Sequence, residues 1–323
     1  MTKQIDSNTT DSSSKNTCST TTTVIICTRD RPDDLRGCLQ SLEEQSVLPD
    51  RVVIVAGSEV SCPSNIVDCF HSLDIVVVDS HENNISISRN VGLKATTTEF
   101  ALFIDDDAKA HDDWVESYLK VFADQPLAWA IGGKVLDSRS IPYSIEFAYG
   151  LVSTTGMQIP VRSDEQAPRP RGYFNTVKGC NFGVRCQQIH QLGGFDSFFA
   201  FAYDEADLML TIEHAGGLVM HAQSPVVDHA HTPGHYRQAH PLDCDWRVEY
   251  ASHTMFMLKH THRFQRIYGE LVIVRRFCKL VCDASIAALR RQISPSRCGG
   301  ILRDARIGIG EARVVYSERD SRV

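Results

Sequence analysis

Several patterns that would assign a protein class at once are missing from this 323-residue sequence. No apolar run approaches the roughly 20 residues that a transmembrane helix needs, and no signal-peptide core follows the first residues. The 11 cysteines form no C-x-x-C pair, so we expect free thiols in a reducing compartment and no disulfide framework. These absences predict a cytoplasmic chain that does not span a membrane.

Charge of one sign does not dominate either, since 33 Lys and Arg stand against 40 Asp and Glu. A hydrophobic content of 42% and a charged content of 23% exclude a fully disordered chain, a collagen and a coiled coil. The basic residues gather late, because residues 260–323 hold 13 Lys and Arg against 6 Asp and Glu. An acidic body argues against a nucleic-acid partner, but the basic segment could meet an anionic surface.

Hydrophobic patterning divides the chain into three parts. Residues 1–22 are nearly all polar and predict a disordered tail, because they cannot bury enough apolar surface to offset their ordering entropy. Short apolar strands then alternate with amphipathic helices, which predicts an α/β domain over 23–240 with a mostly parallel sheet covered by helices on both faces. Within it, residues 138–175 lose periodicity, which indicates a functional flap. Residues 241–323 predict a C-terminal helical, basic extension.

Three consecutive aspartates, Asp105, Asp106 and Asp107, follow the apolar run 100–104. Carboxylates this close repel one another, and a divalent cation removes that cost. The carboxyl end of a central strand is where open α/β sheets bind ligands. Oxygen ligands suit Mg²⁺ or Mn²⁺, with a substrate diphosphate completing the coordination. A solvated acidic turn is the alternative.

Two further acidic residues, Asp204 and Glu205, open a predicted helix. The helix dipole alone favours acidic residues there, but one carboxylate could also serve as a general base for a hydroxyl nucleophile. Downstream, the sequence has a cluster of histidines: His221, His229, His231, His235 and His240. Their spacing matches no zinc motif, so we expect one histidine to complete an aspartate-bound metal site.

Taken in order, six short stretches of this sequence resemble the family 2 glycosyltransferases, which have the nucleotide-sugar-binding GT-A fold. They are VIICTRDRP at 24–32, ISRNVGL at 87–93, FIDDD at 103–107, GCNF at 179–182, GGFD at 193–196 and DEADL at 204–208. Each stretch alone is weak, but their order and spacing are specific. The resemblance covers about residues 23–236 and implies a Rossmann-like GT-A domain.

The resemblance also implies roles for individual residues. The ends of its D-x-D motif correspond to Asp105 and Asp107, which would hold Mn²⁺ or Mg²⁺ together with His229. The donor-binding residues would be Thr28, Arg29, Arg89, Asp105 and Asp106. Glu205 falls where the family's catalytic base usually lies, preceded by Asp204.

Two departures from the family pattern affect these roles. The aspartate that often follows the second strand and contacts the base is replaced by Ala56-Gly57-Ser58, so the nucleotide stays open. The acidic pair is Asp then Glu, where the family usually has Glu then Asp.

The implied reaction is metal-dependent, inverting transfer of a sugar from a nucleotide-sugar donor to a saccharide or lipid-linked acceptor. Two alternatives remain. A sugar nucleotidyltransferase shares the architecture but would want a basic or glycine-rich phosphate loop near 24–35. A non-catalytic carbohydrate-binding protein would need neither the aspartates nor Glu205.

The segment 271–289 predicts an amphipathic helix. Arg275, Arg276, Lys279 and Asp283 share one face at helical spacing, and the apolar residues Val274, Phe277, Leu280, Val281 and Leu289 lie opposite. The apolar face is expected to pack on the domain. The alternative is peripheral contact of residues 271–291 with an anionic membrane at its inner face.

Overall fold

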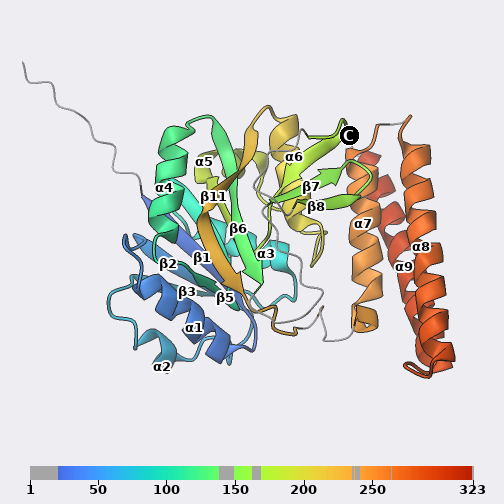
Figure 1. The fold of residues 1–323 in the computed structure, drawn as a ribbon, viewed down its shortest axis with the longest axis horizontal. Helices are drawn as coiled ribbons and strands as arrows, with labels where there is room; N and C mark the ends of the chain where they lie inside the picture. The colour runs from blue at the N-terminus through green and yellow to red at the C-terminus, as the bar shows by residue number, and fades with distance from the viewer. Residues whose placement is uncertain are drawn as a thin grey trace, which may run out of the picture.

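A computed structural model describes residues 21–137, 149–161, 169–234, 236, 241–262 and 264–321. Figure 1 shows an α/β body on one side and a layer of long helices on the other. The predicted disordered tail over 1–22 lies outside the described residues except at its end. There the prediction is wrong by one residue, because Thr22 already belongs to the first strand and its N–H donates to Asp50 at 2.8 Å.

An eight-stranded sheet forms the body, in the order β3-β2-β1-β4-β10-β6-β11-β5. Its strands are β1 (Thr22–Thr28), β2 (Arg51–Ala56), β3 (Ile75–Asp79), β4 (Phe100–Asp105), β5 (Ala108–Ala110), β6 (Ala128–Asp137), β10 (Asn181–Arg185) and β11 (Leu218–His229). The four strands from β3 to β4 are parallel, and so are β6 and β11. Only β10 and β5 run antiparallel to their neighbours, so the predicted mostly parallel sheet is confirmed.

Helices cover both faces of this sheet, as the sequence predicts. They are α1 (Pro32–Glu43), α2 (Ser64–Val67), α3 (Ile85–Lys94), α4 (Trp114–Asp124), α5 (Cys186–Leu192) and α6 (Asp204–His214). Alternate side chains of a strand point to opposite faces. In β1, Ile26 therefore joins the core under α1, α2 and α4, whereas Ile25 joins the core under α3, α5 and α6. Burial on both faces explains why these strands read as continuous apolar runs.

Part of the predicted flap is regular structure. A second, three-stranded antiparallel sheet is built from β7 (Tyr149–Ser153), β8 (Gln158–Val161) and β9 (Tyr173–Thr176). Residues 138–148 and 162–168 of the flap lie outside the described residues. The expectation of an irregular segment over 138–175 is thus wrong for these three strands, whose few residues carry too little alternation to be read from the sequence.

The C-terminal part contains three long helices after the 3₁₀ turn η1 (Pro241–Asp243): α7 (Trp246–His260), α8 (Arg266–Leu289) and α9 (Pro295–Asp320). Helix α7 packs against both α8 and α9 (Figure 1). No helix within the described ranges is both long enough and apolar enough to cross a membrane. The helical extension is confirmed, although the sequence of 295–320 gives only a weak pattern.

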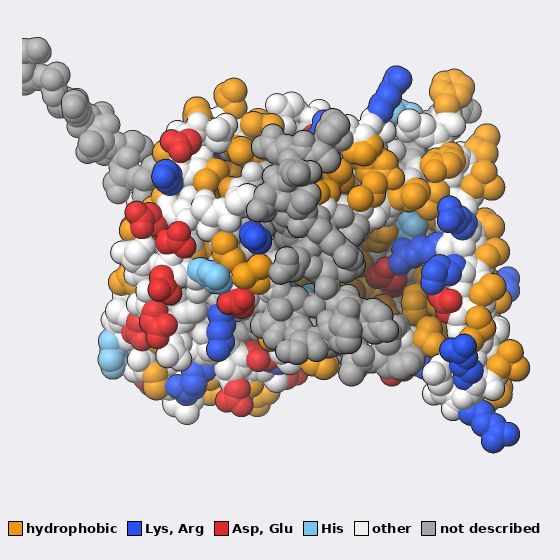
Figure 2. Space-filling model, in the orientation of Figure 1, with side chains coloured by type: hydrophobic (Ala, Val, Ile, Leu, Met, Phe, Trp, Pro, Cys, Tyr) orange, Lys and Arg blue, Asp and Glu red, His pale blue; other side chains and the backbone are white. Residues whose placement is uncertain are grey.

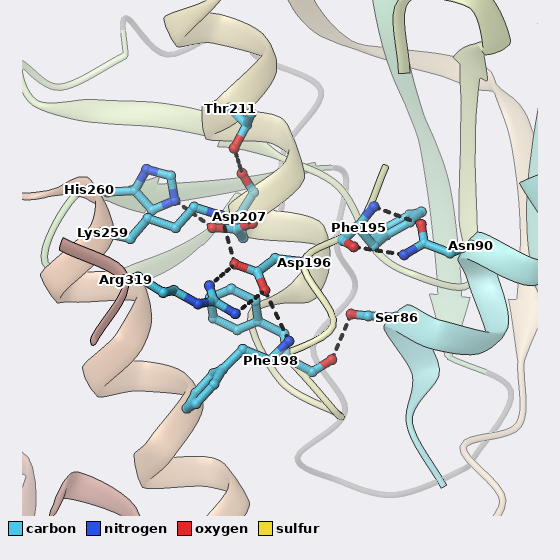
Figure 3. A network of polar contacts seen from close by, with 11 residues as sticks. Ser86, Asn90, Phe195, Asp196, Phe198, Asp207, Thr211, Lys259, His260 and Arg319 are labelled. Atoms are coloured by element: carbon cyan, nitrogen blue, oxygen red, sulfur yellow. Dashed lines mark hydrogen bonds and ion pairs between the residues drawn. The ribbon is translucent and has the colours of Figure 1, made fainter. Parts of the chain in front are cut away.

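Polar contacts fasten this extension to the helix that opens with Asp204 and Glu205. Buried Asp207 of α6 accepts hydrogen bonds from Lys259 Nζ and His260 Nε2, both at 2.8 Å (Figure 3). Asp196 forms an ion pair with Arg319 of α9 at 2.7 Å. Burial alone would raise the pKa of Asp196, but Arg319 and Lys259 lower it to about 2. The extension is therefore held to α6 and to the loop before it by buried or partly buried ion pairs.

The expected faces of the predicted helix at 271–289 are partly wrong. Leu280 is buried as expected, but Val274 is 55% exposed and Leu289 is 83% exposed. Arg276 points inward to Glu249 and makes an ion pair with it. The reason is that α9 covers only one side of α8, so the opposite side keeps apolar residues without a cover among the described elements.

Candidate functional site

A cleft of about 680 Å³ lies at the carboxyl ends of β1 and β4. These strands flank the point where the sheet order reverses, since β2 and β3 extend to one side of β1 and β4 lies on the other. That position is the usual ligand crevice of open α/β sheets. The volume falls within the range of small-molecule sites, about 300–1,000 Å³. The cleft is therefore the candidate active site.

Most of the residues singled out from the sequence line this cleft. They are Thr28, Arg29, Arg89, Asp105, Asp204, Glu205 and His229. They come from the ends of β1, β4 and β11, from the residue after β1, from the second turn of α3 and from the first turn of α6. The fold thus brings together residues that are as far apart in the chain as Thr28 and His229.

The three consecutive aspartates have different surroundings. The Asp105 side chain is 32% exposed to the cleft, whereas Asp106 is fully buried. Asp106 accepts hydrogen bonds from Thr28 Oγ1 at 2.8 Å and Arg31 Nε at 3.1 Å. Burial raises the pKa of Asp106 to about 7, against the effect of Arg31. Asp106 therefore positions Thr28 and Arg31, and its side chain is not among those that line the cleft.

Asp107 is also buried, and both of its oxygens have partners. Its Oδ2 accepts from the backbone N–H of Thr232 at 2.7 Å, and its Oδ1 lies 3.1 Å from His229 Nε2. Arg31 Nη1 lies 3.5 Å from Oδ2. Of the three aspartates, Asp105 has the carboxylate most open to a ligand.

A potential metal-binding group forms around His229. Ligand atoms of Asp105, Cys180 and His229 all lie within 4.8 Å of one another, and His229 Nε2 is 3.8 Å from Asp105 Oδ2. Burial opposes protonation of His229, but Cys180 and Asp107 beside it raise its pKa to about 10. The negative environment that favours this proton would equally favour a cation, so the donor set fits a divalent metal.

Arg89 connects the two acidic regions. The guanidinium, on α3, pairs with Asp204 and lies 3.6 Å from Glu205 Oε1 and 3.9 Å from Asp105 Oδ1. It also donates to the carbonyl of Gly179 at 3.1 Å. Because its side chain is only 5% exposed, Arg89 is a buried cation that orients both carboxylates at the start of α6.

The two carboxylates of this pair differ in electrostatics. Burial and the adjacent Glu205 raise the pKa of Asp204, which is 3% exposed. For Glu205, burial acts in the same direction but Arg89 and a hydrogen bond from Asp204 outweigh it, so its pKa is lowered. Glu205 therefore keeps its negative charge and can accept a hydrogen bond from a hydroxyl group in the cleft.

The position of Gly179 leaves no room for a side chain. A Cβ at this position would overlap both Glu205 Oε1 and Arg89 Nη2. The backbone of the segment before β10 therefore approaches the acidic pair as only glycine allows. From the sequence alone, this glycine resembles an ordinary turn residue.

Cys180 and Arg31 also belong to the site, although the sequence reasoning gave neither of them a role. Arg31 binds two of the aspartates, and Cys180 is 3% exposed and lines the cleft beside His229. Both residues lie in stretches that resemble the family: Arg31 is the next-to-last residue of VIICTRDRP, and Cys180 is the second residue of GCNF.

Comparison with known proteins supports the resemblance read from the sequence. Residues 23–143 match the model of glycosyl transferase family 2. A glucosyl-dolichyl phosphate glucuronosyltransferase of Haloferax volcanii is 31% identical over 54% of this chain and 55% of its own length. A pre-mycofactocin glycosyltransferase of Mycobacterium tuberculosis is 26% identical over 64% of this chain and 42% of its own length. The chain thus spans about half the length of these curated relatives.

Solved structures confirm the GT-A fold. A Pyrobaculum calidifontis mannosyltransferase in complex with GDP-Man and Mn²⁺ superposes on 93% of this chain and 75% of its own, with a TM-score of 0.50 and 15% identity. GalNAc-T7 with UDP, GalNAc and Mn²⁺ covers 73% of this chain and 50% of its own, with a TM-score of 0.55 and 12% identity. At such low identity these similarities establish the fold alone.

Proposed function

Because residues 23–143 match the model of glycosyl transferase family 2, we propose that this chain transfers a sugar from a nucleotide-sugar donor to a hydroxyl group of an acceptor. One observation carries the proposal: Asp105, His229 and Glu205 converge on a single cleft, although they come from β4, β11 and α6. A cation-binding group and a general base in one cleft are what such a transfer would need. Relatives named as glycosyltransferases support the same activity.

The nucleotide end of the donor would occupy the side of the cleft lined by Thr28 and Arg29. Thr28 is fixed by its hydrogen bond to Asp106, and the Arg29 guanidinium donates to the carbonyl of His81 at 3.2 Å. A divalent cation, Mn²⁺ or Mg²⁺, bound by Asp105 and His229 would neutralise charge on the departing diphosphate. The Mn²⁺ in two structures of similar fold supports this use of the site.

Glu205 would accept the proton of the acceptor hydroxyl. Its carboxylate is 23% exposed at the cleft, whereas that of Asp204 is 4% exposed and paired with Arg89. A base must reach the proton that it removes, which favours Glu205 as the base. Asp204 then positions Arg89, which in turn orients Glu205. The acceptor oxygen would attack the anomeric carbon opposite the diphosphate, and this single displacement inverts the anomeric centre.

A donor screen tests this proposal. The purified chain is incubated with nucleotide sugars, Mn²⁺ and candidate acceptors, and release of nucleoside diphosphate is followed. Glu205→Gln should lower kcat at least ~10²-fold, a typical share for general-base catalysis, with the donor Kd nearly unchanged. Glu44→Gln, a change of an exposed carboxylate at the end of α1, is the matched control.

Other outcomes of the screen would identify the alternatives. Release of pyrophosphate from a nucleoside triphosphate would assign the chain to the sugar nucleotidyltransferases. Donor binding without turnover on any acceptor would leave a carbohydrate-binding protein. Loss of activity in Asp204→Asn but not in Glu205→Gln would move the base by one residue. The anomeric configuration of the product, measured by NMR, tests inversion separately.

We also propose that the outer face of α8 rests on an anionic membrane. Large apolar side chains follow this face: Phe264, Ile267, Leu271, Val274 and Leu289, each at least 55% exposed. Basic residues accompany them: Arg275, Lys279, Arg290 and Arg291. Figure 2 shows hydrophobic and basic side chains mixed along this edge of the molecule. Such a face binds a membrane surface through apolar burial and attraction to anionic lipids.

A lipid-linked acceptor would explain this placement, because the relative named for a glucosyl-dolichyl phosphate carries such a lipid in its name. Co-sedimentation with phosphatidylserine-containing and neutral vesicles at two salt concentrations tests the membrane contact. Binding should require the anionic lipid and weaken with salt. Val274→Ser together with Leu289→Ser should abolish it, whereas Leu127→Ser, a change of a 77% exposed residue on the sheet body, should not. A protein that stays in the supernatant at low salt would refute the contact.

A further inference from the structure

Three strands of the main sheet, β4, β10 and β11, bring a thiol into the candidate cation site. Asn181 of β10 pairs with Ile104 of β4 in antiparallel register, so the preceding residue, Cys180, lies across from Asp105. His229 is the last residue of β11, two strands along the sheet from β10. Sγ of Cys180, a carboxylate oxygen of Asp105 and a ring nitrogen of His229 lie within 4.8 Å of one another.

These separations fit ligands of a single ion. Two ligands bound at about 2.0–2.3 Å lie roughly 3–4.5 Å apart, and Asp105 Oδ2 is 3.8 Å from His229 Nε2. Asp107 is less available, because its Oδ2 already accepts from the Thr232 N–H and lies near Arg31. Its Oδ1 contacts His229 Nε2, which suits a carboxylate that orients a metal-binding histidine.

We propose that Cys180 is a ligand of the divalent cation, together with Asp105 and His229, and that its sulfur sets the metal preference of the site. This inference rests on the proposed cation role in the glycosyltransferase. Thiolate is a soft ligand that favours transition metals over Mg²⁺, which prefers oxygen ligands in an octahedron. The site should therefore bind Zn²⁺, Co²⁺ or Cd²⁺ through sulfur more tightly than Mn²⁺, and Mn²⁺ more tightly than Mg²⁺. Metal binding releases the thiol proton to solvent.

Another cysteine in the same cleft provides a matched control. Cys27 also lines the cleft, but it is not part of the group formed by Asp105, Cys180 and His229. Burial and the surrounding carboxylates, despite Arg89, raise the pKa of the Cys27 thiol to about 12. Cys27→Ser thus removes a cleft thiol without removing a proposed ligand.

Titration of the purified chain with Cd²⁺, without donor or acceptor, tests the proposal. Thiolate-to-metal charge-transfer absorption at one equivalent should appear in the unchanged protein and in Cys27→Ser. It should be lost in Cys180→Ser, and Mn²⁺ affinity measured by calorimetry should fall at least ~10-fold in that variant, the scale of losing a supporting group at a metal site. The affinity of Cys180→Ser for Mg²⁺ should change less, so the ratio of Mn²⁺ affinity to Mg²⁺ affinity should be smaller in this variant than in the unchanged protein.

If Cys180→Ser does not fold, His229→Gln provides a second test, because the proposed site needs Asp105, Cys180 and His229 together. The band should weaken in His229→Gln as well. Undiminished absorption in the folded Cys180→Ser, or in His229→Gln, would overturn the proposal. Sugar transfer without the absorption would refute the thiol ligand but leave the proposed function intact. Absorption without sugar transfer from any donor would support the thiol ligand but contradict the proposed function.

Discussion

Replacement of Arg89 by methionine should destabilise the protein far more than loss of a surface arginine. Arg89 is 5% exposed and pairs with Asp204, which is 4% exposed, while Glu205 lies 3.6 Å away. Arg89→Met keeps most of the side-chain volume but leaves these carboxylates without their cation. Removing one partner of a buried ion pair costs about 3–5 kcal/mol, because the other charge stays buried. We therefore expect a loss of that size in the free energy of unfolding.

Arg51→Met is the matched control for this prediction. Arg51 pairs with Asp74 at 2.8 Å, but the two side chains are 40% and 54% exposed. An exposed ion pair is worth about 0–1 kcal/mol. Urea unfolding of both variants, followed by circular dichroism and fitted with a common slope, measures the difference.

The pH dependence gives a second measurement of the same effect. Burial and Glu205 already raise the pKa of Asp204 in the folded protein, and Arg89 opposes that rise, so removal of Arg89 should raise this pKa further above its value in the unfolded chain. A group of this kind stabilises the fold at low pH and loses that contribution as the pH rises through its folded pKa. The free energy of unfolding of Arg89→Met should therefore fall further below that of wild type as the pH rises above the ordinary carboxyl range of about 4. A gap no larger than that of Arg51→Met, or one that narrows as the pH rises, would refute the role assigned to Arg89.

Three further predictions follow from the site and its support. Asp107→Ala should abolish transfer and lower Tm, because Thr232 N–H and His229 lose their acceptor; activity that survives both this change and EDTA would contradict a metal role. Gly179→Ala should cost about 1–3 kcal/mol of stability and reduce kcat, since its Cβ would overlap the Glu205 and Arg89 side chains, whereas Gly299→Ala in α9 meets nothing within 4 Å and should be neutral or stabilising. Burial lowers the pKa of His221 to about 4, and burial with Arg276 lowers that of His253 to about 3. At each of these histidines the unfolded chain binds a proton that the folded chain refuses, so each should cost about 2 kcal/mol of stability at about pH 5 relative to neutral pH, an effect that Asp106, with its pKa raised to about 7, opposes. Urea unfolding of His253→Gln should therefore show about 2 kcal/mol less acid destabilisation than wild type, and the same pH dependence in both proteins would contradict this prediction.

The sequence alone determined much of the sheet. The run at 100–104 could be predicted as a central strand because Phe100, Leu102 and Ile104 pack on one face and Ala101 and Phe103 on the other. Burial on both faces leaves an unbroken apolar run, which is a local signal. The acidic residues directly after it therefore had to lie at the ligand-binding edge, and Glu205 had to lie at a helix start.

Helix α9 was hard to predict because small residues make its contacts. Ala305, Gly308 and Ala312 are buried in it, and a Cβ at Gly308 would overlap the backbone of Arg247 in α7. Close approach of two helix backbones needs small side chains, so the usual stripe of large apolar residues is absent. The exposure of Leu289 could not be predicted from the sequence either, because it depends on which side of α8 is covered by α9.

Tertiary structure alone decided which of the acidic, thiol and imidazole groups meet. Asp105, Asp106 and Asp107 are equivalent in the sequence, yet Arg31 and Thr28 bind the second and Thr232 binds the third. Cys180 reaches Asp105 only because β10 enters the sheet antiparallel to β4. Strand pairing between segments 75 residues apart leaves no local pattern, since it depends on how the whole sheet closes around its core. The sequence therefore determined the kinds of groups available, and the fold determined which of them can share one ligand.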